Sequence, residues 1–329
     1  MRRLVSILLS LVAVLWLSRP AVAAEKVRVA YSSISANWAP VYVAQEARLF
    51  QKHGLEVELV YLAGGSKTSQ AMAAGEIPIG MVAASSLVAA ELAGSPQTLV
   101  ATSIGVVTMS LYVSPEIRRV EDLKGKKIGV TRFGSSTDLS ARALLSKYRM
   151  EPGKDAAILQ MGGMPEILAG LVSKAVSAGV ISMPTIAEAE KAGFKELVDI
   201  PSAVGLQYPH VAVGTTRDYL RKSRENVKNF LRAYIEGTAR FYKDKDLAKQ
   251  AIRKWTKTED PQVLERTYVY QARYFQKVPL TTDAGVQVVL DELARQIPKA
   301  KEARPADLYD NSLVHELAAE GFIDQVFGK

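Results

Sequence analysis

Cysteine is absent from the 329 residues, and histidine occurs only three times. Without cysteine the chain has no disulfide bond, no thiolate metal site and no thiol nucleophile. His53, His210 and His315 have no partner at the spacing of metal ligands, and neither a P-loop nor a G-x-S-x-G nucleophile elbow occurs. The sequence therefore predicts no cofactor and no metal site, and it argues against an enzyme.

Blocks of basic residues are lacking as well. Lysine and arginine total 42 against 34 acidic residues, which gives a formal net charge of +8. These charges are spread along the chain, whereas a nucleic-acid-binding arm concentrates them. We therefore expect no nucleic-acid partner, although a mildly positive field favours small anions.

The first 24 residues have the pattern of a secretory signal peptide. Two arginines precede an apolar run, 4–17, and small residues follow at 21–24. The run is shorter than the roughly 20 apolar residues that a membrane span needs. We predict cleavage after Ala23 or Ala24 and export to the periplasm, with residues 1–24 outside the fold.

Strand-like and helix-like segments alternate from residue 26 onward. This alternation predicts β-α-β units, in which ligand-binding loops follow the carboxyl ends of the parallel strands. After residue 210 the chain becomes helical, with apolar residues three or four positions apart between 227 and 242. The predicted strands are 27–31, 55–60, 77–82, 98–101, 109–113, 128–131, 157–161, 178–181 and 196–200.

These segments predict an α/β protein with two lobes. Lobe 1 is expected to comprise 25–113 and 210–329, including the helix-rich C-terminal part. Lobe 2 is expected to be an inserted segment, 114–209. The chain would then cross between the lobes twice, and a hinge of two strands lets such lobes close around a small ligand.

The stretch 127–140 combines a buried strand, a glycine turn and a run of hydroxyl residues that begins a helix. Ser135 and Asp138 fit an S-x-x-D capping pattern. Free amides at a helix start also bind anions, so the stretch is either a self-capped loop or an anion site. Asp138 leaves a further alternative open, because its carboxylate is either the capping partner or a group that selects a ligand with an amine.

Several runs of sequence resemble one family, the solute-binding proteins of the nitrate/sulfonate/taurine type. This group shares a domain with thiamine-pyrimidine synthases. Two positions depart from the family pattern, because Pro78 and Ser177 stand where an aspartate is usual. The runs that carry the resemblance are 37–50 (N-W-A-P-V-Y-V-A-Q-E-A-R-L-F), 52–57 (K-H-G-L-E-V), 73–80 (A-A-G-E-I-P-I-G), 122–130 (D-L-K-G-K-K-I-G-V) and 162–166 (G-G-M-P-E).

The resemblance implies a type II periplasmic-binding-protein fold and a receptor that delivers a small molecule to an ABC permease. We expect a monomer. A periplasmic sensor subunit, which presents its ligand to a membrane kinase, stays open as an alternative. A synthase is disfavoured because the iron-binding cysteine cluster of those enzymes is missing. The ligand stays open between a sulfonate, nitrate, a carboxylate such as an aromatic acid, and a thiamine-related pyrimidine.

By position in the family, the ligand site would lie between the lobes. Asn37 would hydrogen-bond the ligand and Trp38 would offer an apolar face, or both would pack as a helix cap and a lid. The hydroxyl run Ser135–Thr137 is the strongest single candidate. The full predicted set is Ser33, Ser35, Asn37, Trp38, Gly65, Ser66, Ala84 and Ser85 from lobe 1, and Gly134, Ser135, Ser136, Thr137, Asp138, Met183 and Pro184 from lobe 2.

Overall fold

The computed structural model describes residues 25–204 and 208–328. The predicted signal peptide and its cleavage site lie outside these residues. Within the described ranges no helix has both the length and the apolar character needed to cross a membrane. The same ranges contain no group of three histidine or acidic side chains placed to hold a metal ion.

The first sheet has five strands in the order β2-β1-β3-β10-β4. β1 (Glu25–Tyr31) lies parallel to β2 (Leu55–Tyr61) and to β3 (Ile79–Val82), as expected for β-α-β units. The late strand β10 (Val211–Thr216) lies antiparallel between β3 and β4 (Gln97–Ile104). The C-terminal part of the chain is thereby built into the first sheet.

Helices begin directly after the strands of this sheet. β1 is followed by the 3-10 helix η1 (Ala36–Trp38) and by α2 (Ala39–Glu46), β2 by α4 (Gly65–Ala73), and β3 by α5 (Ala84–Leu92). Pro40 stands in the first turn of α2, where no amide hydrogen is needed. Because β1, β2 and β3 are parallel, η1, α4 and α5 all begin at one edge of the sheet.

The second sheet also has five strands, in the order β7-β6-β8-β5-β9. β6 (Lys127–Val130) lies parallel to β7 (Ala157–Gln160) and to β8 (Ala178–Ile181). β5 (Ser110–Val113) lies antiparallel to β8 and to β9 (Lys195–Asp199). The helices connected to this sheet are α6 (Ser136–Lys147), α7 (Met164–Val172), α8 (Thr185–Lys191) and α9 (Ile200–Val204), with a short 3-10 helix η2 (Val120–Leu123) before β6.

The predicted boundary of lobe 1 at residue 113 is wrong. The strand predicted at 109–113 was expected in the first sheet, but β5 pairs with β8 and β9 in the second. All four residues of β5 are buried, and a short strand buried on both faces carries no sign of which sheet it joins. The first crossing between the lobes therefore lies between Ile104 and Ser110. The second lies between α9 and β10 and includes Tyr208–His210.

The C-terminal part is helical, as the sequence predicts. Along α11 (Arg224–Lys243), the buried residues Val227, Phe230, Leu231 and Tyr234 follow a spacing of three or four, and α11 packs against α2. The remaining helices are α3 (Leu49–Lys52), α10 (Arg217–Lys222), α12 (Lys245–Thr256), α13 (Pro261–Gln271), α14 (Asp283–Leu293), η3 (Pro298–Lys301), η4 (Pro305–Asp307), α15 (Ser312–Ala319) and α16 (Phe322–Phe327).

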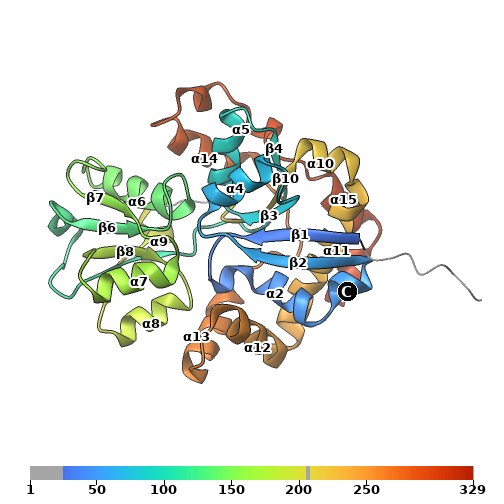
Figure 1. The fold of residues 1–329 in the computed structure, drawn as a ribbon, viewed down its shortest axis with the longest axis horizontal. Coiled ribbons are helices and arrows are strands. Elements are labelled where there is room, and N and C mark those ends of the chain that lie inside the picture. The colour runs from blue at the N-terminus through green and yellow to red at the C-terminus, as the bar shows by residue number, and fades with distance from the viewer. Residues whose placement is uncertain (1–24, 205–207, 329) are drawn as a thin grey trace, which may run out of the picture.

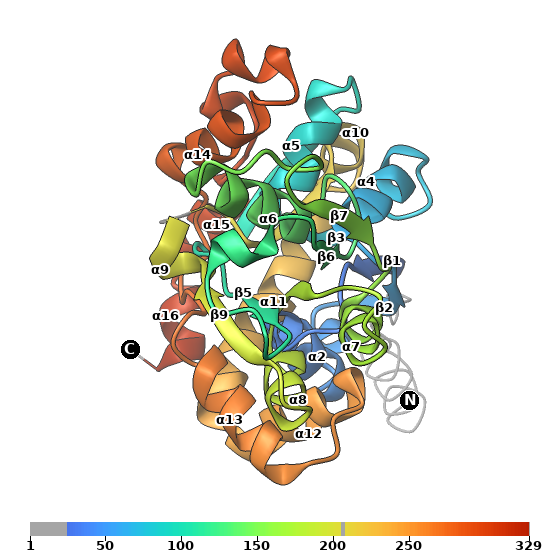
Figure 2. The same cartoon turned by 90° about the vertical axis from the view of Figure 1, so that its left-hand side faces the viewer.

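The two sheets lie side by side, each with its own helices. Figure 1 shows β6, β7 and β8 with α6–α9 at the left, and the first sheet with α2 and α11 at the right. Buried apolar side chains continue from one lobe into the other, because Leu87 on α5 and Leu144 on α6 belong to the same hydrophobic cluster. Helix α13 reaches across and contacts α8, and Figure 2 shows these two helices close together.

Candidate functional site

A buried polar cluster joins both crossing segments to lobe 1. Asn37 Oδ1 accepts hydrogen bonds from Thr108 Oγ1 at 3.0 Å and from Gln271 Nε2 at 2.7 Å. His210 Nδ1 accepts from the backbone N–H of Thr108 at 3.2 Å. Burial lowers the pKa of His210 to about 4, so this side chain is neutral at physiological pH. Oδ1 is thereby occupied twice, whereas the Nδ2 donors of Asn37 make no hydrogen bond within the described residues and Asn37 lines the cavity described next.

A small cavity lies between the two lobes next to this cluster. Its volume is about 20 Å³, which is room for about one water-sized group. None of the described residues around it is charged at neutral pH. The lining residues are Ser32, Ser33, Asn37, Trp38, Gly65, Ala83, Ser86, Met109, Thr131, Ser135, Ser136, Thr137, Met164 and His210.

Four helices from the two lobes begin at this cavity. They are α4 and α5 from lobe 1, and α6 and α7 from lobe 2, and their first residues or N-caps are among the lining residues. None of the four has a side chain that caps its first-turn amides. Elsewhere in the described chain both kinds of start occur: α12, α13 and α14 are capped by the side chains of Asp244, Asp260 and Thr282. Helices α2, α8, α11 and α15 have no side-chain cap. Uncapped N-termini offer N–H donors and a positive potential, the features that bind anions. At α5 the first amide, that of Ala84, already donates to the carbonyl of Pro209, and Asp138 and Glu166 stand in the first turns of α6 and α7.

The lobe 1 side of the cavity is held together by close packing. The Trp38 ring is almost fully buried and donates from Nε1 to Ser33 Oγ at 2.8 Å. Because Ser33 Oγ accepts this bond, its own hydrogen remains free to donate to a ligand. Gly65 is required for space, since a Cβ there would lie 2.3 Å from Ser86 Oγ. Ser86 Oγ donates across the lobes to the carbonyl of Gly134 at 3.2 Å.

The hydroxyl run at the start of α6 behaves differently from the predicted capping box. Ser135 makes no capping bond to the helix, so that prediction is wrong. Instead Ser135 Oγ donates to the carbonyl of Arg132 at 2.6 Å and lies 2.8–2.9 Å from the hydroxyls of Thr131 and Thr137. Thr137 Oγ1 accepts from the Thr131 amide at 2.9 Å. These hydroxyls stabilise the turn and leave the first amides of α6 uncapped.

Asp138 points away from the cavity. Its carboxylate accepts from the Gly134 amide at 2.9 Å and from Arg142 Nε at 2.8 Å. Burial raises the pKa of this carboxyl, and the two hydrogen-bond donors act against that shift. Asp138 is 3% exposed and is absent from the cavity lining. The carboxylate therefore does not face a ligand in the cavity. Of the two roles left open by the sequence, this favours a structural partner at the start of α6 over a group that selects a ligand with an amine.

Other predicted residues make contacts between the lobes. Ser35 Oγ donates to the carbonyl of Met183 at 3.1 Å, and the Ala36 amide donates to the same oxygen at 3.0 Å. Neither Ser35 nor Met183 lines the cavity. Pro184 is the N-cap of α8 and is also absent from the lining.

The remaining members of the predicted set are near the cavity without lining it. The Ala84 amide donates to the carbonyl of Pro209 at 2.8 Å. Ser85 Oγ is buried without a hydrogen-bond partner among the described residues. Gly134 receives the bond from Ser86, and a Cβ on Gly134 would lie 3.9 Å from the side chain of Ser66.

Seven lining residues were not in the predicted set. Met109 and His210 come from the crossing segments, and only the folded chain shows that these segments border the cavity. Thr131 and Met164 flank predicted loops, and Ser86 stands next to a predicted residue, so loop position was the available signal for them. The seven are Ser32, Ala83, Ser86, Met109, Thr131, Met164 and His210.

Solved structures with this arrangement include proteins named for binding alkanesulfonate and nitrate. The alkanesulfonate-binding protein SsuA from Xanthomonas axonopodis pv. citri, bound to MOPS, superposes with a TM-score of 0.73 at 20% identity and covers 88% of this chain and 99% of its own. The periplasmic nitrate-binding protein NrtA from Synechocystis PCC 6803 superposes with a TM-score of 0.74 at 15% identity and covers 90% of this chain and 88% of its own. The chain therefore has the two-lobed α/β fold of periplasmic binding proteins.

The sequence comparisons name the family. Residues 35–248 match the model of the family described as NMT1/THI5 like. A protein of Brachyspira hyodysenteriae, named as an ABC transporter periplasmic binding protein, is 24% identical over 246 residues, which is 70% of this chain and 69% of that protein. The chain belongs to the NMT1/THI5-like family, as the resemblance in its sequence predicts.

Proposed function

We propose that this protein is the periplasmic substrate-binding component of an ABC importer and captures a small anion between its lobes. The observation that carries the proposal is the set of four uncapped helix N-termini, two from each lobe, around a cavity without a charged side chain. Helix amides and dipoles stabilise an anion without a lysine or arginine. A cation is disfavoured by the same positive potential, and a neutral acceptor gains less from it than an anion does.

Closure of the lobes supplies the binding mechanism. Because donors come from both lobes, an anion binds the closed form better than the open form and shifts the population toward it. Direct contacts already join the lobes, among them Ser86 to Gly134 and Arg132 Nε to the carbonyl of Ala63 at 3.0 Å. The cavity of about 20 Å³ requires the lobes to separate before a sulfonate or larger ligand enters. In this mechanism the hinge includes the crossing segments 105–109 and 208–210.

The comparisons support the assignment to import. Proteins named for binding alkanesulfonate and nitrate share the fold, and a relative is named for an ABC transporter. In the proposed arrangement lobe 1 comprises 25–104 and 211–328, and lobe 2 comprises 110–204. The exported monomer delivers its ligand to a permease in the inner membrane. A periplasmic sensor subunit would bind its ligand in the same cavity. The two functions differ only in whether a permease or a sensor kinase in the membrane recognises the closed form.

The test is a thermal-shift screen of residues 25–329 against nitrate, methanesulfonate, benzoate and a neutral aminopyrimidine. A ligand that binds only the folded protein raises its melting temperature with the logarithm of concentration. We expect at least one anion to give a saturable shift and the pyrimidine to give none. A shift with the pyrimidine alone contradicts the anion assignment. No shift with any anion up to tens of millimolar contradicts the proposed capture of small anions.

A further inference from the structure

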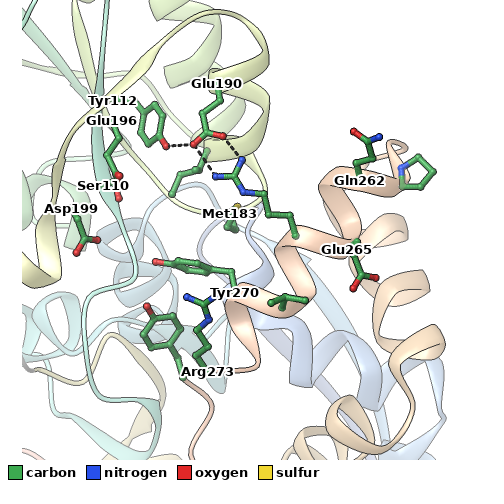
Figure 3. A pocket seen from close by; sticks show the side chains of 15 residues that line it. Ser110, Tyr112, Met183, Glu190, Glu196, Asp199, Gln262, Glu265, Tyr270 and Arg273 are labelled. Carbon is green, nitrogen blue, oxygen red and sulfur yellow. Dashed lines mark hydrogen bonds and ion pairs between the residues drawn. The ribbon is translucent and has the colours of Figure 1, made fainter.

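A second and much larger cavity lies at the junction of the lobes. This groove has a volume of about 800 Å³, within the size range of sites for small organic ligands. One wall is α13, which packs with lobe 1, and the other is formed by β5, β9 and α8 of lobe 2. Figure 3 shows the side chains of both walls pointing into it. None of the cavity-lining residues of the proposed anion site borders the groove.

Part of the charge in the groove is already paired. Glu190 accepts from Tyr112 Oη at 2.6 Å and is held by both terminal nitrogens of Arg266, one of them at 2.9 Å. Glu265 pairs with Lys245 at 2.5 Å and with Lys249 at 3.5 Å. These pairs neutralise two of the four carboxylates that line the groove.

Two carboxylates on β9 remain without an ion pair among the described residues. These are Glu196 and Asp199, and Asp199 accepts a hydrogen bond only from Ser202 at the start of α9. Figure 3 shows the side chain of Tyr270 pointing across the groove toward Asp199. Burial raises the pKa of Tyr270 most, and Tyr274, Asp199 and Glu196 raise it further. Arg273 lies on the same wall and places one positive charge in the groove.

Aromatic surface lies opposite these carboxylates. The rings of Tyr270 and Tyr274 have centroids 5.1 Å apart at an angle of 53°. Aromatic faces attract organic cations, and the attraction grows when the cation leaves bulk water. A metal ion is disfavoured, because the described residues hold no group of three acidic or histidine side chains suited to one. Two carboxylates without ion pairs next to tyrosine rings can recognise an ammonium group that carries a hydrocarbon substituent.

We propose that this groove is a second ligand site that binds a small organic cation, with its ammonium group between Glu196 and Asp199 and its hydrocarbon part against Tyr270 and Tyr274. Because the carboxylates belong to lobe 2, and Tyr270 and Tyr274 to α13 and the turn that follows it, a bound cation joins the two lobes. The site is independent of the anion cavity, so each can be present without the other.

The probe is benzylamine, which is a cation at pH 7, compared with benzyl alcohol, which has the same ring and no charge. Calorimetric titration of residues 25–329 is expected to give a Kd of about 1 mM or tighter for benzylamine. Benzyl alcohol is expected to bind at least about tenfold more weakly, because it lacks the charge that the carboxylates attract. Equal binding of the two probes overturns the proposal. So does the absence of benzylamine binding at about 10 mM, tenfold above the expected Kd.

Matched variants locate the binding. The double variant Glu196→Gln/Asp199→Asn removes two charges from the groove. The control Glu56→Gln/Glu58→Gln removes two exposed charges of β2, which pair with Lys26 and Arg28. The first is expected to raise the benzylamine Kd at least about tenfold and the second to leave it unchanged. Should the first double variant fold poorly, Glu196→Gln alone carries the test, since Glu196 is exposed. An unchanged Kd in the groove variant overturns the proposal without bearing on the anion screen.

Discussion

The orientation of the Asn37 amide makes the sharpest test of the anion cavity. Replacement by alanine removes the acceptor of Gln271 Nε2, whereas the Thr108 hydroxyl can turn to His210 Nδ1, 3.2 Å away. One buried donor is then stranded, at a cost of about 1–3 kcal/mol of folding stability. Replacement by aspartate keeps an oxygen acceptor for both donors but presents an anionic oxygen to the cavity instead of N–H. Asn37→Asp therefore keeps the acceptor contacts but buries a carboxylate without a cation, so it is expected to lose anion binding and to regain stability as the pH falls and the carboxyl protonates.

The expected loss follows from the strength of one bond. A hydrogen bond to a charged group contributes about 1.5–3 kcal/mol, so losing the Nδ2 donor weakens anion binding about 10- to 150-fold. The assay is urea unfolding of both variants at pH 7, with calorimetric titration of whichever of nitrate, methanesulfonate or benzoate gives the largest shift in the native protein. The reasoning is refuted if Asn37→Asp binds this anion normally.

Three further outcomes test other parts of the structure. Burial lowers the pKa of His210 from 6.5 to about 4, so the unfolded chain takes up a proton at a higher pH than the folded chain. The free energy of unfolding therefore falls by about 3 kcal/mol as the pH drops from above 6.5 to below 4. In urea unfolding between pH 7 and 4, His210→Gln should flatten this pH dependence. Ser135→Ala should cost about 1–2 kcal/mol in the same assay, because its hydroxyl bonds the Arg132 carbonyl, and unchanged stability would leave that hydroxyl available to a ligand. Arg266→Gln should cost less than about 1 kcal/mol, since the Arg266–Glu190 pair is largely exposed, and a loss above about 2 kcal/mol would show that this pair holds the lobes together.

Local sequence patterns were sufficient for most of the fold. Helix α11 could be predicted because its buried positions recur with the helical period over 20 residues. The strands of the two sheets could be predicted from short apolar runs between turn residues. The lobe to which β5 belongs could not, because pairing of a fully buried strand depends on partners that are distant in sequence, β8 and β9.

The candidate site was predictable as a set of loops and less so as a set of side chains. Loops after the parallel strands meet at one edge for topological reasons, and the structure brings the predicted loops 32–38, 64–66, 83–86, 132–138 and 162–164 to the cavity. Which way each side chain turns depends on its neighbours. Asp138 turns to Arg142, and Ser35 turns to the carbonyl of Met183, because each finds a hydrogen-bond partner there.

By itself, the sequence determined what depends on neighbours along the chain: helical and strand periodicity, the glycines and prolines at helix ends, the absence of cysteine chemistry, and the family resemblance. The tertiary structure alone decided which helix starts remain uncapped, that His210 and Met109 border the cavity, and that Glu196 and Asp199 face Tyr270 across a groove. Those features arise where two lobes meet, and contacts between residues far apart in the chain leave no local pattern in the sequence.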